Sequence, residues 1–311
     1  MSSLEGMGAV RRTAAVAAAL AGMLTAGCSG TTQGSTPAPN GSDAAAAAPA
    51  APAAAATKLL VVIEENHSLA QMRAGMPYAF RLAKKYGYAN QYHAITHPSL
   101  PNYLAIAGGN TFGVSDDAEP AAHRLTGHSV FGQALAHHRT ATVYVQSMPS
   151  PCATVSSDPY AVKHNPWAYF VRERRQCRSH DVGMRRFGND VAAGRLPTLG
   201  MVVPDLQHDA HNGSLQQADA WFHSLMRRVF AGPDWRSGHL VVVLTADEDD
   251  GNQGNRVLTV VIHPSQRHHV VTRRLGHYSL TRLYDEVAHL PLLRHARTAH
   301  SMAKAFGLPL G

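Results

Sequence analysis

Four short clusters of the 311-residue chain combine carboxylates, histidines and amides at close spacing. They are Glu64-Glu65-Asn66-His67-Ser68, Pro204-Asp205 with His208-Asp209 and His211, Asp247-Glu248-Asp249-Asp250-Gly251, and Gly276-His277-Tyr278. Oxygen and nitrogen donors of this kind suit a hard or borderline divalent cation. Each cluster taken alone is more typical of a solvated loop, and it is the common position of the clusters in the fold that favours a site.

The spacing of these residues excludes two common metal motifs. Counting from Asp247, the turn glycine falls at the fifth place and Leu258 stands at the twelfth, so the acidic run is not an EF-hand. The chain also has no His-Glu-x-x-His sequence of a zinc protease. Gly109-Asn110-Thr111-Phe112-Gly113 has the spacing of a nucleophile elbow with Thr in place of Ser, but a Gly-rich turn explains it as well.

A further segment, His97-Pro98-Ser99-Leu100-Pro101-Asn102-Tyr103, offers a nucleophile. Its two prolines restrict the backbone around Ser99 and Asn102, so both side chains can be held in one orientation. A serine is a poor nucleophile until a base or a bound cation activates it. The segment is therefore either a rigid turn or the nucleophile of a metal-assisted site.

The elements that must position these residues follow from the apolar pattern. Runs rich in Val, Leu and Ile predict strands at 59–63, 142–145, 199–203, 240–244 and 257–262, and helix-like segments lie at 78–86, 129–138, 216–230 and 279–288. This alternation predicts an α/β fold with a mostly parallel sheet covered by helices on both faces. Ligands bind beyond the carboxyl ends of such strands, where the polar clusters stand.

Composition favours one globular domain over residues 58–311. Hydrophobic residues make up 45% of the chain and charged residues 16%, enough for a substantial core. The net charge of +7 raises the question of nucleic acid, but Lys and Arg are scattered and no basic cluster is interleaved with stacking aromatics. We expect no nucleic-acid partner. The positive electrostatic field would equally attract a phosphorylated small substrate or an anionic membrane surface.

The first 57 residues have the character of an export signal and a tether. Arg11-Arg12 followed by an apolar run at 13–26 predicts a signal peptide that is too short to span a bilayer. It ends in Leu24-Thr25-Ala26-Gly27-Cys28, which is similar to a bacterial lipoprotein processing site, so residues 1–28 predict membrane attachment through lipidated Cys28; an ordinary cleaved signal is the alternative. Residues 29–57, rich in Ala, Pro and Ser, predict a disordered spacer.

The other two cysteines, Cys152 and Cys177, predict a disulfide, because an exported protein folds in an oxidising compartment. A metal site built on cysteine would need more than these two ligands. The chain is therefore expected outside the cytoplasm, either anchored by lipid on the outer side of the cell membrane or secreted.

Taken in order, the motifs resemble the bacterial and fungal phosphoesterase family of acid phosphatases and phospholipases C. The similarity runs from about residue 59 to residue 290 and rests on Ile63 to Ser68, Thr96 to Leu104, Val202-Val203-Pro204 with Asp209-x-His211, the acidic run at Asp247, and His277-Tyr278-Ser279-Leu280. Three further motifs, Asn110 to Gly113, Lys163-His164-Asn165-Pro166-Trp167 and Asp219-Ala220-Trp221, are similar to the short branch typified by secreted mycobacterial acid phosphatases.

The resemblance implies an alkaline phosphatase-like fold and a metal-assisted phosphoseryl intermediate. It implies that Ser99 is the nucleophile and that Asn102 donates to a phosphate oxygen. The residues implied around a metal that also meets Ser99 are Glu65, Asn66, Asp247 and Glu248. Those implied to bind a second metal, or to hold the phosphate and protonate the leaving oxygen, are Asp205, Asp209, His211 and His277. The superfamily's Asp-His-Gly metal motif is replaced by the acidic run, so the number of metals stays open.

The resulting expectation is an exported, metal-dependent acid phosphatase acting on phosphate monoesters, either small substrates or phospholipid headgroups. Three alternatives remain. A phospholipase C-like phosphodiesterase would use the same residues, although His67-Ser68-Leu69-Ala70 replaces the Arg-Ser-Phe-Asp of long phospholipases C. A metal-free serine hydrolase would use Ser99, Asp247 and His277, which follow a known chain order. A non-catalytic lipoprotein would bind a ligand without turnover.

Overall fold

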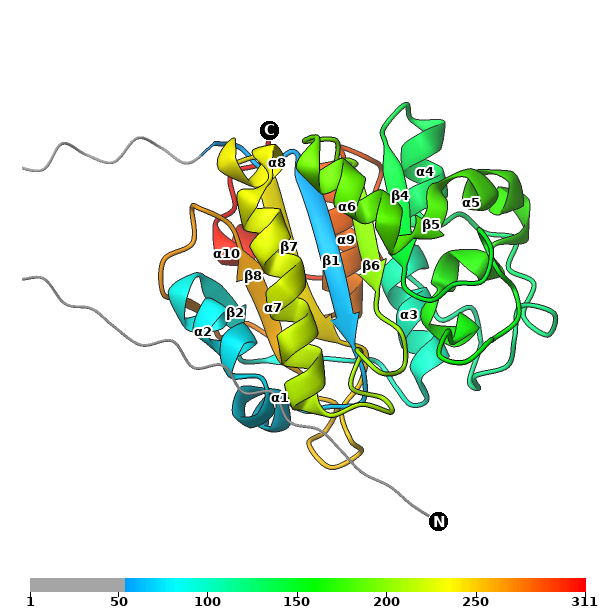
Figure 1. The fold of residues 1–311 in the computed structure, drawn as a ribbon, viewed down its shortest axis with the longest axis horizontal. Helices are drawn as coiled ribbons and strands as arrows, with labels where there is room; N and C mark the ends of the chain where they lie inside the picture. Colours follow the sequence, from blue (N-terminus) through cyan, green and yellow to red (C-terminus); the bar gives the residue numbers. More distant parts are fainter. Residues whose placement is uncertain (1–53) are drawn as a thin grey trace, which may run out of the picture. The chain divides into compact units, whose positions relative to one another are not determined.

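A computed structural model describes residues 54–311 of the chain (Figure 1). The predicted signal peptide at 1–28, the lipidation site Cys28 and most of the predicted spacer lie outside these described residues. Within them, none of the helices combines the length and apolar character needed to cross a membrane.

An eight-stranded sheet forms the centre of the fold, in the order β5-β4-β6-β1-β7-β8-β2-β9. Its strands are β1 (Lys58–Glu64), β2 (Gly87–Ala89), β4 (Ala141–Val145), β5 (Asp181–Gly183), β6 (Leu199–Val203), β7 (Leu240–Ala246), β8 (Thr259–Ile262) and β9 (His269–Val271). Neighbours pair in parallel except for β8, which runs antiparallel to both β7 and β2. The predicted mostly parallel sheet is confirmed, and every residue of β6, β7 and β8 is buried, as expected for strands covered on both faces.

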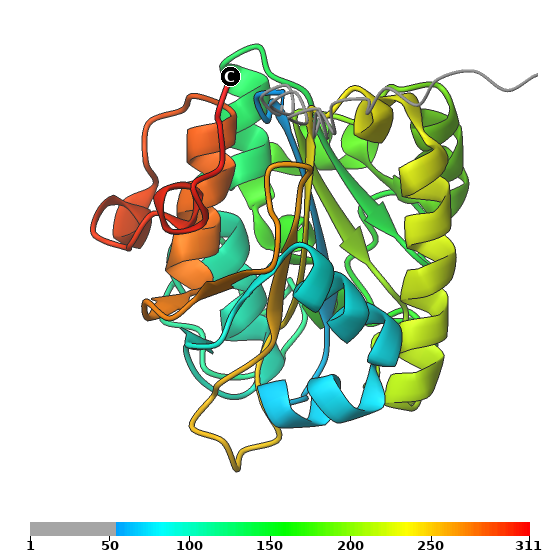
Figure 2. The ribbon, with the colours of Figure 1, turned by 90° about the vertical axis from the view of Figure 1, so that its left-hand side faces the viewer.

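Helices cover both faces of this sheet, and Figure 2 shows α7 on one side and α9 on the other. The helices are α1 (Leu69–Gly75), α2 (Pro77–Lys85), α3 (Ser99–Gly108), α4 (Val130–Ala136), α5 (Arg174–His180), α6 (Met184–Ala192), α7 (Leu215–Ala231), α8 (Pro233–Arg236), α9 (His277–Val287) and α10 (Met302–Phe306). Helices α1, α2 and α6 pack against α7, whereas α3, α4 and α10 pack against α9. The four predicted helices are present as α2, α4, α7 and α9.

Serine caps explain where two of these helices begin. The Ser214 hydroxyl accepts a hydrogen bond from the Gln217 amide and the Gln217 side chain accepts one from the Ser214 amide, which starts α7 with a capping box. The Ser129 hydroxyl accepts a hydrogen bond from the Gly132 amide at the start of α4. Each cap satisfies a backbone donor that a helix leaves open in its first turn.

The parallel strands bring the polar clusters to one edge of the sheet. The Glu65 amide donates to the Asp209 carbonyl at 2.7 Å and the Asp247 amide donates to the Glu64 carbonyl at 3.0 Å, so the end of β1 is hydrogen-bonded to the loop after β6 and to the end of β7. Because β8 is antiparallel, its carboxyl end points to the opposite edge. The chain returns through β9 and β10 (Leu275–Gly276), and β10 pairs with β3 (Tyr92–His93) before His277 begins α9.

The globular part begins slightly before the predicted boundary at residue 58. Ala56 is buried, its amide donates to the Pro309 carbonyl at 2.7 Å, and it forms an isolated bridge with Leu310. The end of the predicted spacer is therefore paired with the end of the chain, which the Ala/Pro composition did not indicate.

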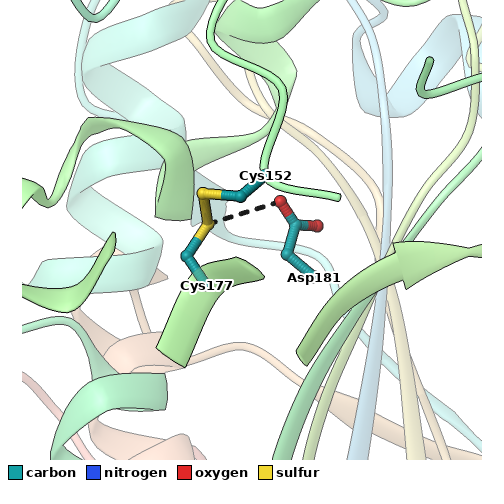
Figure 3. Close-up of side chains that lie close together, drawn as sticks. All are labelled: Cys152, Cys177 and Asp181. Atoms are coloured by element: carbon teal, nitrogen blue, oxygen red, sulfur yellow. Dashed lines mark hydrogen bonds between the residues drawn. A yellow bond between two sulfur atoms is a disulfide. The ribbon is translucent and has the colours of Figure 1, made fainter. Parts of the chain in front are cut away.

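The predicted disulfide between Cys152 and Cys177 is present (Figure 3). Asp181 lies beside it, with Oδ2 at 3.6 Å from the Cys177 sulfur. Burial raises the pKa of Asp181 to about 7, and its Oδ2 accepts a hydrogen bond from the Asn165 amide nitrogen Nδ2 at 2.8 Å. The bridge closes the loop that contains residues 163–165.

Replacing both cysteines, as Cys152→Ser with Cys177→Ser, should lower the free energy of unfolding by about 3 kcal/mol, because a crosslink over a separation of 25 residues restricts the unfolded chain. Urea unfolding of the wild type and the double variant measures the difference. Wild type treated with reductant is the matched control and should unfold at the midpoint of the double variant. Equal midpoints for oxidised wild type and the double variant would contradict a stabilising bridge.

Candidate active site

Helix α3 carries the predicted nucleophile in its first turn. Ser99 is the first residue of α3 and Asn102 lies three residues later, which places both side chains on the same face of the helix. Both are buried. The segment is therefore the start of a buried helix, and a turn alone does not describe it.

The Ser99 hydroxyl faces two carboxylates and one ammonium group. Its Oγ donates to Glu65 Oε2 at 3.1 Å, and Glu248 Oε1 lies at 3.5 Å. Lys163 Nζ lies 3.5 Å from the same oxygen. A serine that donates to a buried carboxylate has a base within reach, which is the arrangement that activates a hydroxyl.

His164 joins two of the strand-end carboxylates. Its Nε2 lies 3.0 Å from Glu65 Oε1, its Nδ1 lies 3.1 Å from Asp209 Oδ2, and its ring stacks on Tyr103. Burial alone would lower the pKa of His164, but Glu65 and Asp209 raise it to about 10. Burial alone would likewise raise the pKa of Glu65, but His164, with Lys163 and His211, lowers it to about 2. Glu65 therefore stays ionised in acid.

Two further carboxylates, Asp247 and Glu248, come from the loop that follows β7, and Glu248 approaches Ser99. Burial raises the pKa of Asp247 well above its ordinary value, and the charges of Glu65 and Glu248 raise it further. Burial also raises the pKa of Glu248, to about 7, although His97 opposes the shift from 3.2 Å. Asn66 has a positive φ of 54°, which Asn tolerates, and its backbone N–H donates a hydrogen bond to Asp247 Oδ1 at 3.1 Å.

These residues fit a divalent cation by their chemistry. Glu65, Asp247 and Glu248 are buried carboxylates whose charges act on one another, and Asp247 Oδ2 is a buried oxygen with no hydrogen-bond partner among the described residues. Buried like charges are costly unless a cation or a proton neutralises them. Oxygen donors are what hard cations prefer. The donors are not gathered in advance, since no three carboxylate or His ligand atoms here lie within 4.8 Å of one another in the described part of the chain.

The one group in residues 54–311 that meets this distance criterion is Cys152, Cys177 and Asp181 (Figure 3). Its sulfur atoms are joined in a disulfide, so neither is a thiolate that could bind a metal. This group stabilises the loop and is not a metal centre.

Asn102 and His277 lie at the site but are occupied by protein contacts. The Asn102 amide nitrogen donates to the Thr96 carbonyl at 2.8 Å and to Glu248 Oε2 at 3.0 Å, so donation to a phosphate oxygen would require it to leave one partner. His277 is fully buried, with Nε2 at 2.6 Å from the Asp247 carbonyl oxygen and Nδ1 at 3.1 Å from the Tyr92 hydroxyl. Burial lowers the pKa of His277 to about 4. In this structure both side chains position their neighbours.

Asp205 has no described contact with Ser99. Its Oδ2 accepts a hydrogen bond from the Ser147 hydroxyl at 2.6 Å, and its Oδ1 lies 2.7 Å from His208 Nδ1. These contacts hold the β4 and β6 loops together. Asp209, four residues later, contacts His164, so the two carboxylates of the cluster after β6 have different partners.

His211 lies at the exposed rim of the site. Its backbone amide donates to Asp209 Oδ1 at 2.8 Å, and its Nε2 lies 3.4 Å from Lys163 Nζ. Its side chain is exposed, which suits exchange of a proton with substrate and water.

Sequence reasoning gave no role to Lys163, His164 or Asp117. The first two lie in η1 (Val162–His164), away from any strand end, and only the motif Lys163-His164-Asn165 singled them out. Asp117 lies in a loop with other acids, and no sequence signal distinguishes it. Its contacts with Leu100 and Lys163 become visible only in three dimensions.

Comparison with known proteins places this geometry in context. Residues 71–291 match the phosphoesterase family model. The phosphatidylinositol-3-phosphatase of Mycobacterium tuberculosis is 30% identical over 253 residues, which cover 80% of this chain and 82% of that protein. A probable acid phosphatase of Kluyveromyces lactis is 28% identical over 168 residues, 51% of this chain and 40% of the yeast protein.

Solved structures show the same fold at low identity. A protein of the alkaline phosphatase superfamily from Vibrio parahaemolyticus superposes with a TM-score of 0.56 at 10% identity, over 82% of this chain and 72% of that one. The lipoteichoic acid synthase LtaP of Listeria monocytogenes gives 0.54 at 7% identity, over 76% and 73%. The predicted alkaline phosphatase-like fold is confirmed.

Proposed function

This chain belongs to the phosphoesterase family, and we propose that it is an exported, metal-dependent acid phosphatase that hydrolyses phosphate monoesters through a phosphoseryl intermediate on Ser99. Membership of this family shows that the chain is a hydrolase of phosphoric ester bonds. The observation that carries the proposal is the hydrogen bond from Ser99 Oγ to Glu65 Oε2 at the start of α3.

In the first chemical step, Ser99 Oγ forms a bond to phosphorus while the bond from phosphorus to the leaving oxygen breaks. Glu65, ionised at acid pH, accepts the hydroxyl proton. His211, exposed at the rim, gives a proton to the leaving oxygen. The products of this step are the free alcohol and a phosphoseryl enzyme.

In the second step, water attacks phosphorus and gives a proton to His211, the bond between Ser99 Oγ and phosphorus breaks, and Glu65 returns the proton to Ser99. Lys163 faces the oxygens that carry charge in both steps. The hydroxyl, the base and the acid are thus restored at the end of one turnover.

We assign Glu65, Asn66, Asp247 and Glu248 as the residues that would hold a divalent cation. Such a cation would supply charge neutralisation at the phosphate oxygens and favour the ionised serine. The mutual repulsion of these carboxylates and the orphaned Asp247 Oδ2 support this assignment. A second cation on Asp205 has less support, because that carboxylate is bound to Ser147 and His208.

Two features bear on substrate and location. The Mycobacterium tuberculosis relative is named a phosphatidylinositol-3-phosphatase, so a phosphorylated lipid headgroup is a candidate monoester for this chain as well as a small phosphorylated substrate. The Cys152–Cys177 disulfide supports folding in an oxidising compartment, in agreement with export. Anchoring through Cys28 remains a proposal, because that residue lies outside the described part.

The alternative serine hydrolase has no support from the geometry. The described contacts of His277 are with Tyr92 and the Asp247 carbonyl, and Ser99 donates to Glu65. The three residues therefore do not form a Ser-His-Asp relay.

The pH dependence of kcat/KM for p-nitrophenyl phosphate tests the proposed function, and it should be bell-shaped with a maximum between about pH 5 and 7. Glu65, whose pKa is held at about 2, stays ionised throughout. Below about pH 6 a phosphate monoester loses its second negative charge, which lowers the rate on the acid side. Loss of the proton of the general acid lowers the rate on the basic side.

Bis(p-nitrophenyl) phosphate, measured in parallel, should react more slowly at every pH. A rate that rises steadily through pH 9 would show that formation of the serine alkoxide dominates, and the chain would not be an acid phosphatase. A preference for the bis-ester would favour the phosphodiesterase alternative.

A further inference from the structure

Lys163 is the basic side chain that approaches the Ser99 hydroxyl among the described residues. Its Nζ lies 3.5 Å from Ser99 Oγ and 2.9 Å from Asp117 Oδ2. Neither Lys163 nor Asp117 was given a role by the sequence motifs, and the mechanism above uses Lys163 only as a general source of positive charge.

Asp117 fixes Lys163 relative to the nucleophile. One carboxylate oxygen, Oδ1, accepts the Leu100 backbone amide at 2.9 Å, and the other, Oδ2, accepts the Lys163 ammonium. The helix cap residue, Pro98, provides no side-chain hydrogen bond to α3, so Asp117 satisfies a first-turn amide from a distant loop. The Asp117 carboxylate therefore connects Leu100, the residue after Ser99, with the Lys163 ammonium group that faces Ser99.

The backbone that carries Lys163 is also constrained. The adjacent residue, His164, is held between Glu65 and Asp209 and stacked on Tyr103. The disulfide between Cys152 and Cys177 closes the loop that carries both residues. Lys163 is thus a long side chain whose two ends are both fixed, which reduces the entropy lost when its ammonium binds an anion.

Because carboxylates surround Ser99, the positive charge of Lys163 should matter more for phosphate monoesters than for diesters. Glu65 and Glu248 approach Oγ at 3.1 and 3.5 Å. A monoester brings two negative charges on its non-bridging oxygens, whereas a diester brings one because the corresponding oxygen is esterified. The additional charge of the monoester is repelled by the carboxylates unless cations face it, and Lys163 would add its charge to that of the proposed divalent cation.

We propose that Lys163, positioned by Asp117, selects phosphate monoesters over diesters at Ser99. The proposal rests on the proposed function of Ser99 and adds the groups that set its substrate class. Asp117 acts as a positioning residue, since it reaches the ammonium and the helix and has no described contact with Ser99 Oγ itself.

The test compares kcat/KM of the full chain for p-nitrophenyl phosphate and bis(p-nitrophenyl) phosphate in Lys163→Gln and Asp117→Asn. For Lys163→Gln we expect the monoester value to fall about 100-fold and the bis-ester value to fall less than about 5-fold. Asp117→Asn should shift the ratio in the same direction by about 10-fold. Lys163→Arg, which keeps the charge, should retain most of the monoester preference.

Two controls separate this inference from loss of structure and from failure of the proposed function. Lys304→Gln removes an exposed lysine of α10 outside the site and should leave both values unchanged. Equal falls for both esters in Lys163→Gln would overturn the inference, because a merely structural role lowers both. Wild type that hydrolyses neither ester would refute the proposed function itself.

Discussion

Ser99→Ala should lower kcat for p-nitrophenyl phosphate by at least about 10³-fold and leave the fold intact. The substitution removes the oxygen that forms the proposed phosphoseryl bond, and removal of a catalytic nucleophile in other hydrolases costs several orders of magnitude. Ser99 caps no helix by its side chain, so its loss exposes no backbone donor. Steady-state kinetics measures the effect, and the urea midpoint shows whether the fold persists.

Ser115→Ala is the matched control, because Ser115 is an exposed serine outside the site and its removal should leave kcat unchanged. Acid quenching with a ³²P-labelled monoester should trap label on the wild type and none on Ser99→Ala. Activity of Ser99→Ala within tenfold of wild type, or label retained by that variant, would contradict the assignment of the nucleophile.

The central strands could be predicted because they are apolar without interruption. Strands buried on both faces, such as β6 and β7, do not alternate between apolar and polar residues, so each appears in the sequence as a run of apolar residues. The short strands β2, β5 and β9 contain three residues each, which is too few for a periodic signal. The antiparallel direction of β8 depends on the path of the chain between elements, which local sequence does not encode.

Helix α3 could not be predicted for a different reason. All of its residues, from Ser99 to Gly108, are buried, so the sequence shows no polar face and no helical period. Its prolines near the start favoured a turn. A proline within the first helical turn is compatible with a helix, since the amides there have no intrahelical partner.

Sequence reasoning placed side chains close together where they lie at strand ends, and it missed contacts that depend on the tertiary structure. Glu65 and Asp247 directly follow or end parallel strands, so their convergence is a consequence of the topology. Asp205 also follows a strand, but the Ser147 hydroxyl and His208 turn its carboxylate to another loop. His164 reaches Glu65 from an irregular loop closed by a disulfide, and strand-end reasoning could not locate it.

Asp247→Asn should abolish turnover, as should removal of metal from the wild type with a chelator. Asp247 has a buried oxygen with no hydrogen-bond partner in the described part of the chain, and burial and the neighbouring carboxylates raise its pKa, an arrangement expected of a ligand whose cation is essential. Activity should fall by at least about 100-fold in both cases, and added divalent metal should restore the chelated wild type but not the variant. Full activity of a chelated protein that elemental analysis shows to be metal-free would contradict metal dependence.

In chelated, metal-free protein, Asp247→Asn should change the stability in the opposite direction to its effect on activity. Because the folded-state pKa of Asp247 is raised, its favourable contribution exists at low pH and is lost as pH rises through that pKa. Asn keeps the oxygen that accepts the Asn66 amide and removes the charge, so Asp247→Asn should unfold at higher urea than wild type at pH 7, with a smaller difference near pH 3. Asp250→Asn, which changes an exposed carboxylate of the same loop, is the matched control. A variant less stable than wild type at pH 7 would show that the Asp247 carboxylate is held by protein contacts, and its role as a ligand would lose its physical basis.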